Sequence, residues 1–388
     1  MNIIRSFLRY REIQNTKNDI FRILGTIDFS VCKNVRPLKI QKIAMLIPTV
    51  YPNLGGITSA LRILTYIQNN GIETTIVLSS KSQDIESARR NVKLCMRDFE
   101  GNVKTYEESL DIDFDICIAT SWQTVYYAKK LRGYKVYFVQ DYEPDFYETN
   151  DFSMLAKATY TQGFHIISLG KWNVDKIRKN IRNSDLYKMD YIEFPYDKSE
   201  YKFDDRDYLN YANKKTLKIA CYIRFIGRRI PYICEYLLSN TKNELKKYGY
   251  NLEISYFGID KRNKFSSGIN LGKLSRNELY RLYCNSDFGM VASMSNISLV
   301  PYEMLASGLP VVEFRDGSYP YFLGLDTALL INCDYKELAN GILELVNNTA
   351  KLKHMHESAM KKLELLSWDS SCEQFYKILL KTICNTAE

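Results

Sequence analysis

The sequence lacks the long apolar run that a membrane-spanning helix needs. No uninterrupted apolar stretch approaches the roughly 18 residues required to cross a bilayer. The amino terminus, MNIIRSFLRYREIQ, has neither a continuous apolar core nor a small-residue cleavage site, so it does not resemble a secretion signal. These absences predict a cytoplasmic protein, with contact at the inner face of the membrane left open.

Histidines and paired cysteines are also scarce. The chain has three histidines, and its nine cysteines form no CxxC pair and no disulfide-framework spacing. We interpret the cysteines as small buried apolar residues in a reducing compartment. A DxD pattern at Asp111 and Asp113 precedes a predicted strand, which places it at the amino edge of a sheet, away from ligands. We therefore expect neither a metal site nor another cofactor.

The length and the alternation of patterns predict two domains. The chain has 388 residues, of which 46% are hydrophobic and 25% charged, as in globular proteins with more than one core. Strand-like and helical patterns alternate in two blocks separated by a polar stretch, which predicts two doubly wound α/β sheets. The predicted strands are 43–47, 74–78, 115–119, 135–139, 165–168, 217–222, 252–257, 287–292 and 310–312. The predicted domains are a basic helical arm (1–38), two Rossmann-like domains (39–205 and 206–366) and a carboxyl-terminal helix (367–388).

Positive charge is concentrated at the amino terminus. Residues 1–42 contain nine basic and three acidic side chains, which accounts for +6 of the net charge of +8. Apolar residues such as Phe7, Leu8, Phe21 and Leu24 recur there near helical spacing. A basic amphipathic arm can lie on an anionic membrane; the alternative is an extra helix packed on the first domain. Because the charge is confined to this arm, we expect no nucleic-acid binding.

The segment SNISLVPYEMLASGLPVV, residues 295–312, is the most informative part of the chain. It follows an apolar strand and contains a loop, a short helical pattern with Glu303, and a second apolar strand. Open α/β sheets bind ligands at the carboxyl ends of their strands. A carboxylate near a helix amino terminus there suits hydrogen bonds from sugar hydroxyls. The segment predicts a nucleotide-sugar site.

Three arginines follow the first strand of the second predicted domain. Arg224, Arg228 and Arg229 occur in the sequence YIRFIGRR. Guanidinium groups at the end of a strand can hold a diphosphate and stabilise its departure as a leaving group, which makes Arg224 a catalytic candidate as well as a donor-binding one. The alternative is a cluster of surface charges.

Two segments of the first predicted domain are candidates for the acceptor side. Gly55, Gly56 and Ile57 open a helix after the first strand, where glycine allows close approach of a ligand to the backbone. The segment is not G-x-G-x-x-G, and a tight strand-to-helix turn is the alternative. Asp141 and Glu143 follow another strand and are catalytic candidates for accepting or orienting an acceptor proton. A salt-bridged loop is the alternative.

A further loop, LGKLS, contains Gly272, Lys273 and Leu274 and leads into a predicted helix. Ser275 and Glu278 have the spacing of a capping box. The loop either binds a nucleobase or only starts the helix.

Together these motifs resemble the GT-B glycosyltransferases of family 4, and among them the bacterial rhamnosyltransferases of surface glycans of the S-layer type. The resemblance covers about residues 43–383 and rests on the glycine loop, VQDYEPDFY, the arginines, LGKLS and PYEMLASGLPVV. It implies two facing Rossmann-like domains with an interdomain cleft and a carboxyl-terminal helix that crosses back onto the first domain. It also implies retaining, metal-independent sugar transfer.

The resemblance assigns roles to individual residues. Arg224 and Arg229 would bind the diphosphate, Glu303 the sugar ring of the nucleotide, and Gly272–Leu274 the base. Ser298, Leu299 and Val300 would contribute to the same donor site. The acceptor would approach the first domain near the glycine loop and Asp141.

Two positions depart from the family pattern. The first of the family's paired glutamates falls at Ser295, and a histidine of the first domain is replaced by Gln140-Asp141. The loss of the carboxylate fits a deoxy-L-sugar donor, and other donors remain open. We expect transfer of L-rhamnose from dTDP-β-L-rhamnose to a glycan or lipid-linked saccharide. The alternatives are a nucleotide-sugar epimerase of the same fold and a catalytically silent carbohydrate-binding subunit, and a homodimer is left open.

Overall fold

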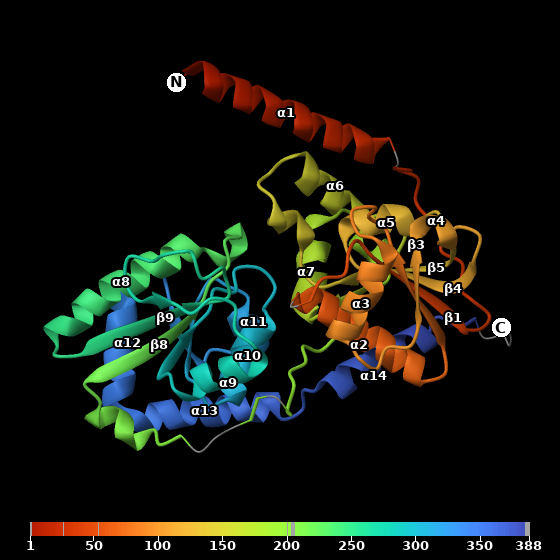
Figure 1. Cartoon of the computed structure of the whole chain (residues 1–388). Coiled ribbons are helices and arrows are strands. Elements are labelled where there is room, and N and C mark those ends of the chain that lie inside the picture. Colours follow the sequence, from red (N-terminus) through yellow and green to blue (C-terminus); the bar gives the residue numbers. More distant parts are fainter. Residues whose placement is uncertain (1, 26, 53, 200, 203–205, 385–388) are drawn as a thin grey trace. The chain divides into compact units, whose positions relative to one another are not determined.

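The computed structural model describes residues 2–25, 27–52, 54–199, 201–202 and 206–384. Its contacts divide the chain into two compact units (Figure 1). The first unit is Met1–Ile192 with Cys372–Glu388, and the second is Glu193–Ser371. Each unit is described by itself.

The first unit is built on a seven-stranded parallel sheet in the order β3-β2-β1-β4-β5-β6-β7. Its inner strands are buried along most of their length, as expected for a parallel sheet with helices on both faces. The strand order reverses between β1 and β4, which is where open sheets of this kind leave room for a ligand. The strands are β1 (Lys42–Ile47), β2 (Glu73–Leu78), β3 (Asn102–Thr105), β4 (Asp113–Ala119), β5 (Arg132–Val139), β6 (His165–Leu169) and β7 (Met189–Ile192).

The helices of the first unit alternate with these strands. They are α1 (Asn2–Leu24), α2 (Gly55–Asn69), α3 (Ile85–Cys95), α4 (Tyr106–Ser109), α5 (Trp122–Ala128), α6 (Asp151–Thr159) and α7 (Lys171–Asn180), with 3-10 turns η1 (Glu143–Phe146) and η2 (Ser184–Leu186). Most of the last helix, α14 (Trp368–Leu380), belongs to this unit, where Phe375 packs edge-on against Phe138 with 5.3 Å between ring centroids.

The second unit contains a six-stranded parallel sheet in the order β10-β9-β8-β11-β12-β13, with its switch point between β8 and β11. The strands are β8 (Thr216–Tyr222), β9 (Asn251–Phe257), β10 (Ile269–Asn270), β11 (Phe288–Met290), β12 (Val311–Phe314) and β13 (Ala328–Ile331). The helices are η3 (Leu209–Asn213), η4 (Gly227–Arg229), α8 (Pro231–Lys247), α9 (Arg276–Cys284), α10 (Leu299–Ala306), α11 (Tyr319–Leu323), α12 (Tyr335–Asn347) and α13 (Thr349–Leu363). The prediction of two parallel α/β sheets is confirmed.

The units divide earlier in the chain than the predicted boundary between residues 205 and 206. The division falls at Glu193 because the following segment packs on the second unit. Phe194 stacks on Tyr302 at 5.5 Å between ring centroids, and Tyr201 packs on Tyr283 at 6.0 Å. The boundary was predicted from the polar composition of this segment, which does not reveal these aromatic contacts.

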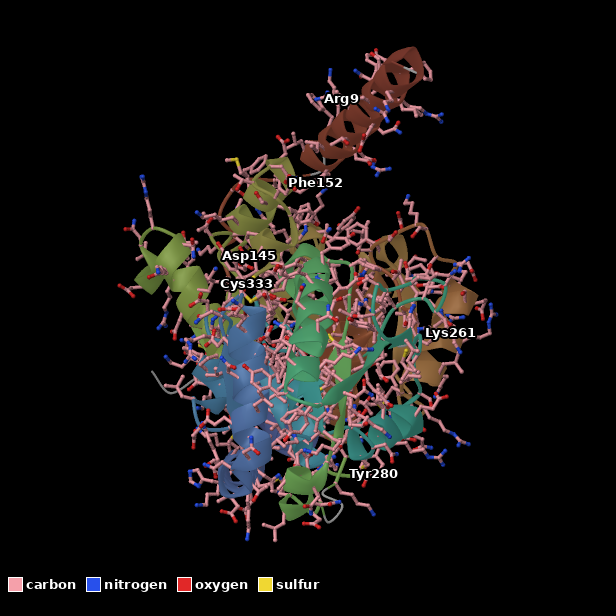
Figure 2. All side chains as sticks on the ribbon, turned by 90° about the vertical axis from the view of Figure 1, so that its left-hand side faces the viewer. Arg9, Asp145, Phe152, Lys261, Tyr280 and Cys333 are labelled. Atoms are coloured by element: carbon pink, nitrogen blue, oxygen red, sulfur yellow. The ribbon has the colours of Figure 1, made fainter. Side chains whose placement is uncertain are left out.

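Among its described residues, the predicted amino-terminal arm, 1–38, is helical only in α1, which ends at Leu24 and docks through its carboxyl-terminal end (Figure 1). Ile23 packs on a small apolar cluster that includes Trp122 and Phe152. Figure 2 labels Phe152 near this end of α1 and Arg9 farther out along the helix. The apolar residues Phe7, Leu8, Tyr10, Ile13 and Phe21 are between 53% and 64% exposed. Among the described residues, no helix combines the length and apolarity that crossing a membrane requires.

The cysteines differ from one another in burial. Cys117, Cys221, Cys234 and Cys372 are buried, as expected for small apolar residues. The interpretation does not hold for all nine, because Cys333 and Cys384 are exposed (Cys333 is labelled in Figure 2).

Candidate functional site

The predicted acceptor segments of the first unit meet at the carboxyl ends of its strands. Gly55 and Gly56 begin α2 directly after the loop that follows β1, and Gln140 follows β5. The side-chain Nε2 of Gln140 donates to the carbonyl oxygen of Gly56 at 3.0 Å. A Cβ atom on Gly56 would lie 3.3 Å from Gln140 Oε1, whereas one on Gly55 would meet nothing within 4 Å. The structure thus brings together two loops that are 84 residues apart in the chain. Ile57, which follows the glycines, is half-buried.

Glu143 lies inside the first unit and is 5% exposed. Its Oε2 accepts the backbone amide of Trp122 at 2.9 Å, and its Oε1 accepts the hydroxyl of Tyr137 at 2.6 Å. Burial, with the Glu143 carboxylate beside it, raises the pKa of Tyr137 well above its ordinary value. These contacts give Glu143 a positioning role at the start of α5. Its selection as a catalytic candidate stays a prediction.

Asp141 is the remaining carboxylate candidate of the loop. It is 9% exposed, and its Oδ1 accepts the backbone amide of Tyr142 at 2.9 Å. Tyr142 stacks on Tyr160 with 5.6 Å between ring centroids, so the loop behind Asp141 is rigidly supported. An acid held this firmly has a fixed direction, which a group that orients an acceptor hydroxyl requires.

The three arginines of the second unit have different environments. Arg224 and Arg228 are half-buried, and Nη1 of Arg224 lies 3.5 Å from the carbonyl oxygen of Gly258. Arg229 is 7% exposed and turns inward: its Nη1 donates to Ala292 O at 3.0 Å. The sequence grouped the three as one diphosphate site. The structure leaves Arg224 and Arg228 accessible and buries Arg229.

A strained turn and an apolar pocket adjoin the arginine loop. Ile230, the residue before α8, has φ of +34° and ψ of 53°, a left-handed conformation that is uncommon for a β-branched residue. The pocket has a volume of about 290 Å³ and is lined by Phe225, Ile226, Ile230, Pro231, Tyr232 and Ile233. Charged groups and an apolar surface therefore lie next to each other at the end of β8.

The predicted base-binding loop follows β10. Gly272 has φ of +87°, and a Cβ atom there would lie 3.2 Å from the Cβ of Lys261, so this turn requires glycine. Lys273 is exposed and Leu274 is half-buried. The predicted capping box is confirmed: Glu278 Oε2 accepts the amide of Ser275 at 2.8 Å.

The loop after β11 leads to α10, which carries Glu303. Ser298 precedes the helix, and its Oγ is buried without a hydrogen-bond partner among the described residues. Leu299, Val300 and Glu303 are half-buried. Burial, together with the nearby carboxylate of Glu303, raises the pKa of Tyr283 well above its ordinary value. A buried hydroxyl directly before α10 and a carboxylate on α10 thus lie at the switch point of the sheet.

Two residues of this region, Ser293 and Glu313, were not identified from the sequence. Ser295 and Ser293 are completely buried, and the Oγ of Ser293 donates to Glu313 Oε1 at 2.6 Å. Burial raises the pKa of Glu313 to about 7, against the opposing effects of Ser293 and Arg229. A single acid inside the apolar run VVEF was the available signal, because a buried carboxylate must find partners.

No cluster of three or more metal-ligating side chains occurs in the part of the chain that the structure describes. His165 pairs with Asp190 at 2.7 Å, and burial lowers its pKa. The DxD acids lie at the amino end of β4, where Asp113 pairs with Arg132 at 3.0 Å.

The fold is that of the two-domain GT-B proteins. The crystal structure of Anabaena HepE in complex with UDP and glucose matches with a TM-score of 0.67 at 13% identity, covering 88% of this chain and all of that one. The sucrose-phosphate synthase of Thermosynechococcus elongatus matches with a TM-score of 0.65 at 11% identity, covering 88% of this chain and 98% of the other.

At the level of sequence, residues 42–171 match the family model of the WsaF amino-terminal domain. The chain is also 25% identical over 277 residues to the O-antigen biosynthesis protein RfbC of Myxococcus xanthus. This alignment covers 69% of the chain and 21% of RfbC, so the chain spans about a fifth of the length of that relative.

Proposed function

We propose that the chain is a glycosyltransferase of glycan biosynthesis that takes its sugar from a nucleotide-sugar donor. The observation that carries the proposal is the arrangement at the switch point of the second sheet. There, Arg224 and Arg228 follow β8, while Ser298 and Glu303 follow β11. Cationic, hydroxyl and carboxylate groups at this edge suit the diphosphate and sugar hydroxyls of one ligand. The WsaF-domain match and the similarity to an O-antigen biosynthesis protein support glycan synthesis.

The roles follow from charge and geometry. Arg224 and Arg228 bind the diphosphate and stabilise the negative charge that develops as the bond from the anomeric carbon to the diphosphate breaks. Glu303 accepts hydrogen bonds from the sugar of the nucleotide, and Gly272, Lys273 and Leu274 contact the base. The acceptor oxygen forms the new bond to the anomeric carbon and loses its proton, with Asp141 orienting the hydroxyl near Gly56.

For the donor we propose dTDP-β-L-rhamnose and transfer with retention. A serine, Ser295, stands where family 4 enzymes usually have a carboxylate for the transferred sugar. A buried hydroxyl in place of that acid suits a 6-deoxy sugar, which has one hydroxyl fewer to bind. The acceptor would be a growing surface glycan.

The deciding experiment pairs donor binding with turnover. Purified protein is screened by thermal shift against UDP-glucose, GDP-mannose and dTDP-β-L-rhamnose, because a bound ligand stabilises the native state. The stabilising donor is then tested for sugar transfer. Binding without transfer to any glycan would indicate a silent carbohydrate-binding subunit, and conversion of the donor without acceptor would indicate an epimerase.

Arg224→Gln tests the diphosphate assignment, with Arg262→Gln as the matched control. The side chain of Arg262 is 90% exposed and pairs with Asp260 on the surface of the same unit. Arg224→Gln is expected to weaken diphosphate binding at least about tenfold, equivalent to about 1.4 kcal/mol. Equal affinities in the two variants would contradict the assignment.

We further propose that α1 contacts the anionic cytoplasmic surface of the membrane. Its described residues carry Arg5, Arg9, Arg11, Lys17 and Arg22 against two acids, and several of its large apolar side chains, from Phe7 to Phe21, are exposed. Basic charge beside exposed apolar surface is the composition of interfacial helices. A membrane location would bring the enzyme to a lipid-linked acceptor.

A further inference from the structure

A buried polar cluster lies beneath the candidate donor loop of the second unit. Glu313 on β12 is fully buried, and its two oxygens accept the hydroxyl of Ser293 at 2.6 Å and the backbone amide of Ser293 at 3.1 Å. The carbonyl of Ser293 accepts the amide of Ser318 at 2.7 Å and its hydroxyl at 3.1 Å. All the polar groups of Ser293 are therefore engaged, which fixes the start of the loop after β11.

Arg229 holds the same loop at two further points. Its Nη1 donates to the carbonyl of Ala292 at 3.0 Å, and its Nη2 lies 3.4 Å from the carbonyl of Asn296. One planar guanidinium thus joins the beginning and the end of the segment 292–296. The nearby Arg229 cation lowers the pKa of the Glu313 carboxyl, against the larger rise that burial causes.

These contacts separate Arg229 from the two accessible arginines. A guanidinium that donates to two backbone carbonyls acts through its rigid geometry, which a lysine cannot reproduce. An arginine that binds a phosphate acts mainly through its positive charge, which a lysine retains. We propose that Arg229 and Glu313 are positioning residues that fix the segment 292–296 for nucleotide binding, and that Arg229 is not a phosphate ligand. The inference rests on the proposed function and deepens it.

The two roles predict different patterns of affinity. A variant that loses only a phosphate contact weakens the binding of a nucleoside diphosphate and leaves the nucleoside unaffected. A variant that displaces the loop weakens both, because Ser298 and Glu303 follow the displaced segment. Arg229→Lys is therefore compared with Arg224→Gln by NMR titration, using UDP with uridine and dTDP with thymidine.

We expect Arg229→Lys to weaken nucleoside and nucleoside diphosphate by a similar factor of about ten. Arg224→Gln is expected to weaken only the diphosphate. If Arg229→Lys binds both ligands as wild type does, or loses affinity only for the diphosphate, the positioning role is wrong.

A milder pair of variants guards against misfolding. Ser293→Ala removes one buried hydroxyl bond to Glu313, and Ser286→Ala removes a comparable one, from a buried serine to the carbonyl of Leu282 at 2.7 Å before β11. Both should lower the melting temperature similarly, but only Ser293→Ala should weaken UDP or dTDP binding, by about threefold to tenfold. Equal nucleotide affinities in the two variants would overturn the inference while leaving the proposed function intact. Failure of the wild type to bind any nucleotide would instead contradict the proposed function.

Discussion

The side-chain amide of Gln140 and the backbone carbonyl of Gly56 form a 3.0 Å hydrogen bond that ties the loop after β5 to the start of α2. Gly56 contacts Gln140 closely, whereas the neighbouring Gly55 faces open space. Gly55 and Gly56 can therefore be compared. A side chain at Gly56 would crowd Gln140, whereas a side chain at Gly55 would crowd only a bound ligand.

We predict that Gly55→Ala leaves folding intact or stabilises it by about 0.5–1 kcal/mol, because alanine reduces the freedom of the unfolded chain. If the acceptor approaches this backbone, the same variant should raise the KM for the acceptor severalfold. Gly56→Ala should affect the acceptor more strongly, since its new methyl group displaces Gln140. The measurements are denaturant unfolding and initial rates at varied acceptor concentration. Unchanged kinetics in both variants would remove the glycine loop from the acceptor site.

The second prediction distinguishes the role of Glu143 in stability from the role of Asp141 in catalysis. Glu143→Gln replaces an oxygen that accepts a buried hydrogen bond by a group that donates, so we expect a loss of about 1–3 kcal/mol in the free energy of unfolding. Asp141→Asn should leave stability almost unchanged and lower kcat by about 100-fold or more. Urea unfolding and steady-state kinetics of both variants test this. The reverse pattern would make Glu143 the catalytic carboxylate.

Glu303 should matter for the nucleotide rather than for the fold. It is half-buried on α10, and a charge-assisted hydrogen bond from a sugar hydroxyl contributes about 1.5–3 kcal/mol. We therefore expect Glu303→Gln to weaken nucleoside diphosphate binding by about tenfold to a hundredfold in calorimetry. The matched control is Glu357→Gln on α13, whose exposed carboxylate pairs weakly with Lys353 at 3.9 Å. If both variants bind as wild type does, Glu303 has no role in the donor site.

The buried acid Glu313 predicts a specific dependence of stability on pH. Burial raises its pKa from 4.5 to about 7, so the folded state holds a proton that the unfolded state releases. Protonation of Glu313 therefore contributes at most about 3 kcal/mol to the free energy of unfolding. This contribution is fully present below about pH 4.5 and is lost as the pH rises through about 7. Glu313→Gln should remove this fall, so the variant loses less stability than wild type between pH 5 and pH 8. Parallel curves for the two proteins would contradict the buried titration.

The sequence predicted the centre of each sheet better than its edges. Every predicted strand matches an interior strand, and the four strands that were missed, β3, β7, β10 and β13, are the edges of the two sheets. Interior parallel strands are buried on both faces and show continuous apolar runs. Edge strands have two to four residues here, and β3 (NVKT) and β10 (IN) show no pattern that distinguishes them from loops, whereas the apolar run ALLI of β13 was missed.

The sequence predicted which loops carry the candidate site, but not which of their side chains are buried. The rule that ligands bind at the carboxyl ends of parallel strands identified the loops of Gly56, Arg224 and Glu303. The sequence could not separate Arg228 from the adjacent Arg229, because only tertiary contacts leave the first half-buried and bury the second. It also could not identify Glu143 as interior, since its partners Trp122 and Tyr137 come from other elements.

The last prediction concerns α1 and the membrane. Replacing Arg5, Arg9 and Arg11 by glutamine should weaken binding to vesicles of phosphatidylglycerol and phosphatidylcholine by about 3 kcal/mol, since each basic residue near an anionic surface contributes about 1 kcal/mol. The matched control replaces Lys261, Arg262 and Lys264, three exposed basic residues of the second unit, by glutamine. Sedimentation is measured at 50 and 300 mM salt, because the electrostatic part is screened. We expect the wild type and the control to sediment at low salt and the α1 variant to remain in solution. Similar sedimentation of all three proteins would show that the charge of α1 does not recruit the chain to lipid.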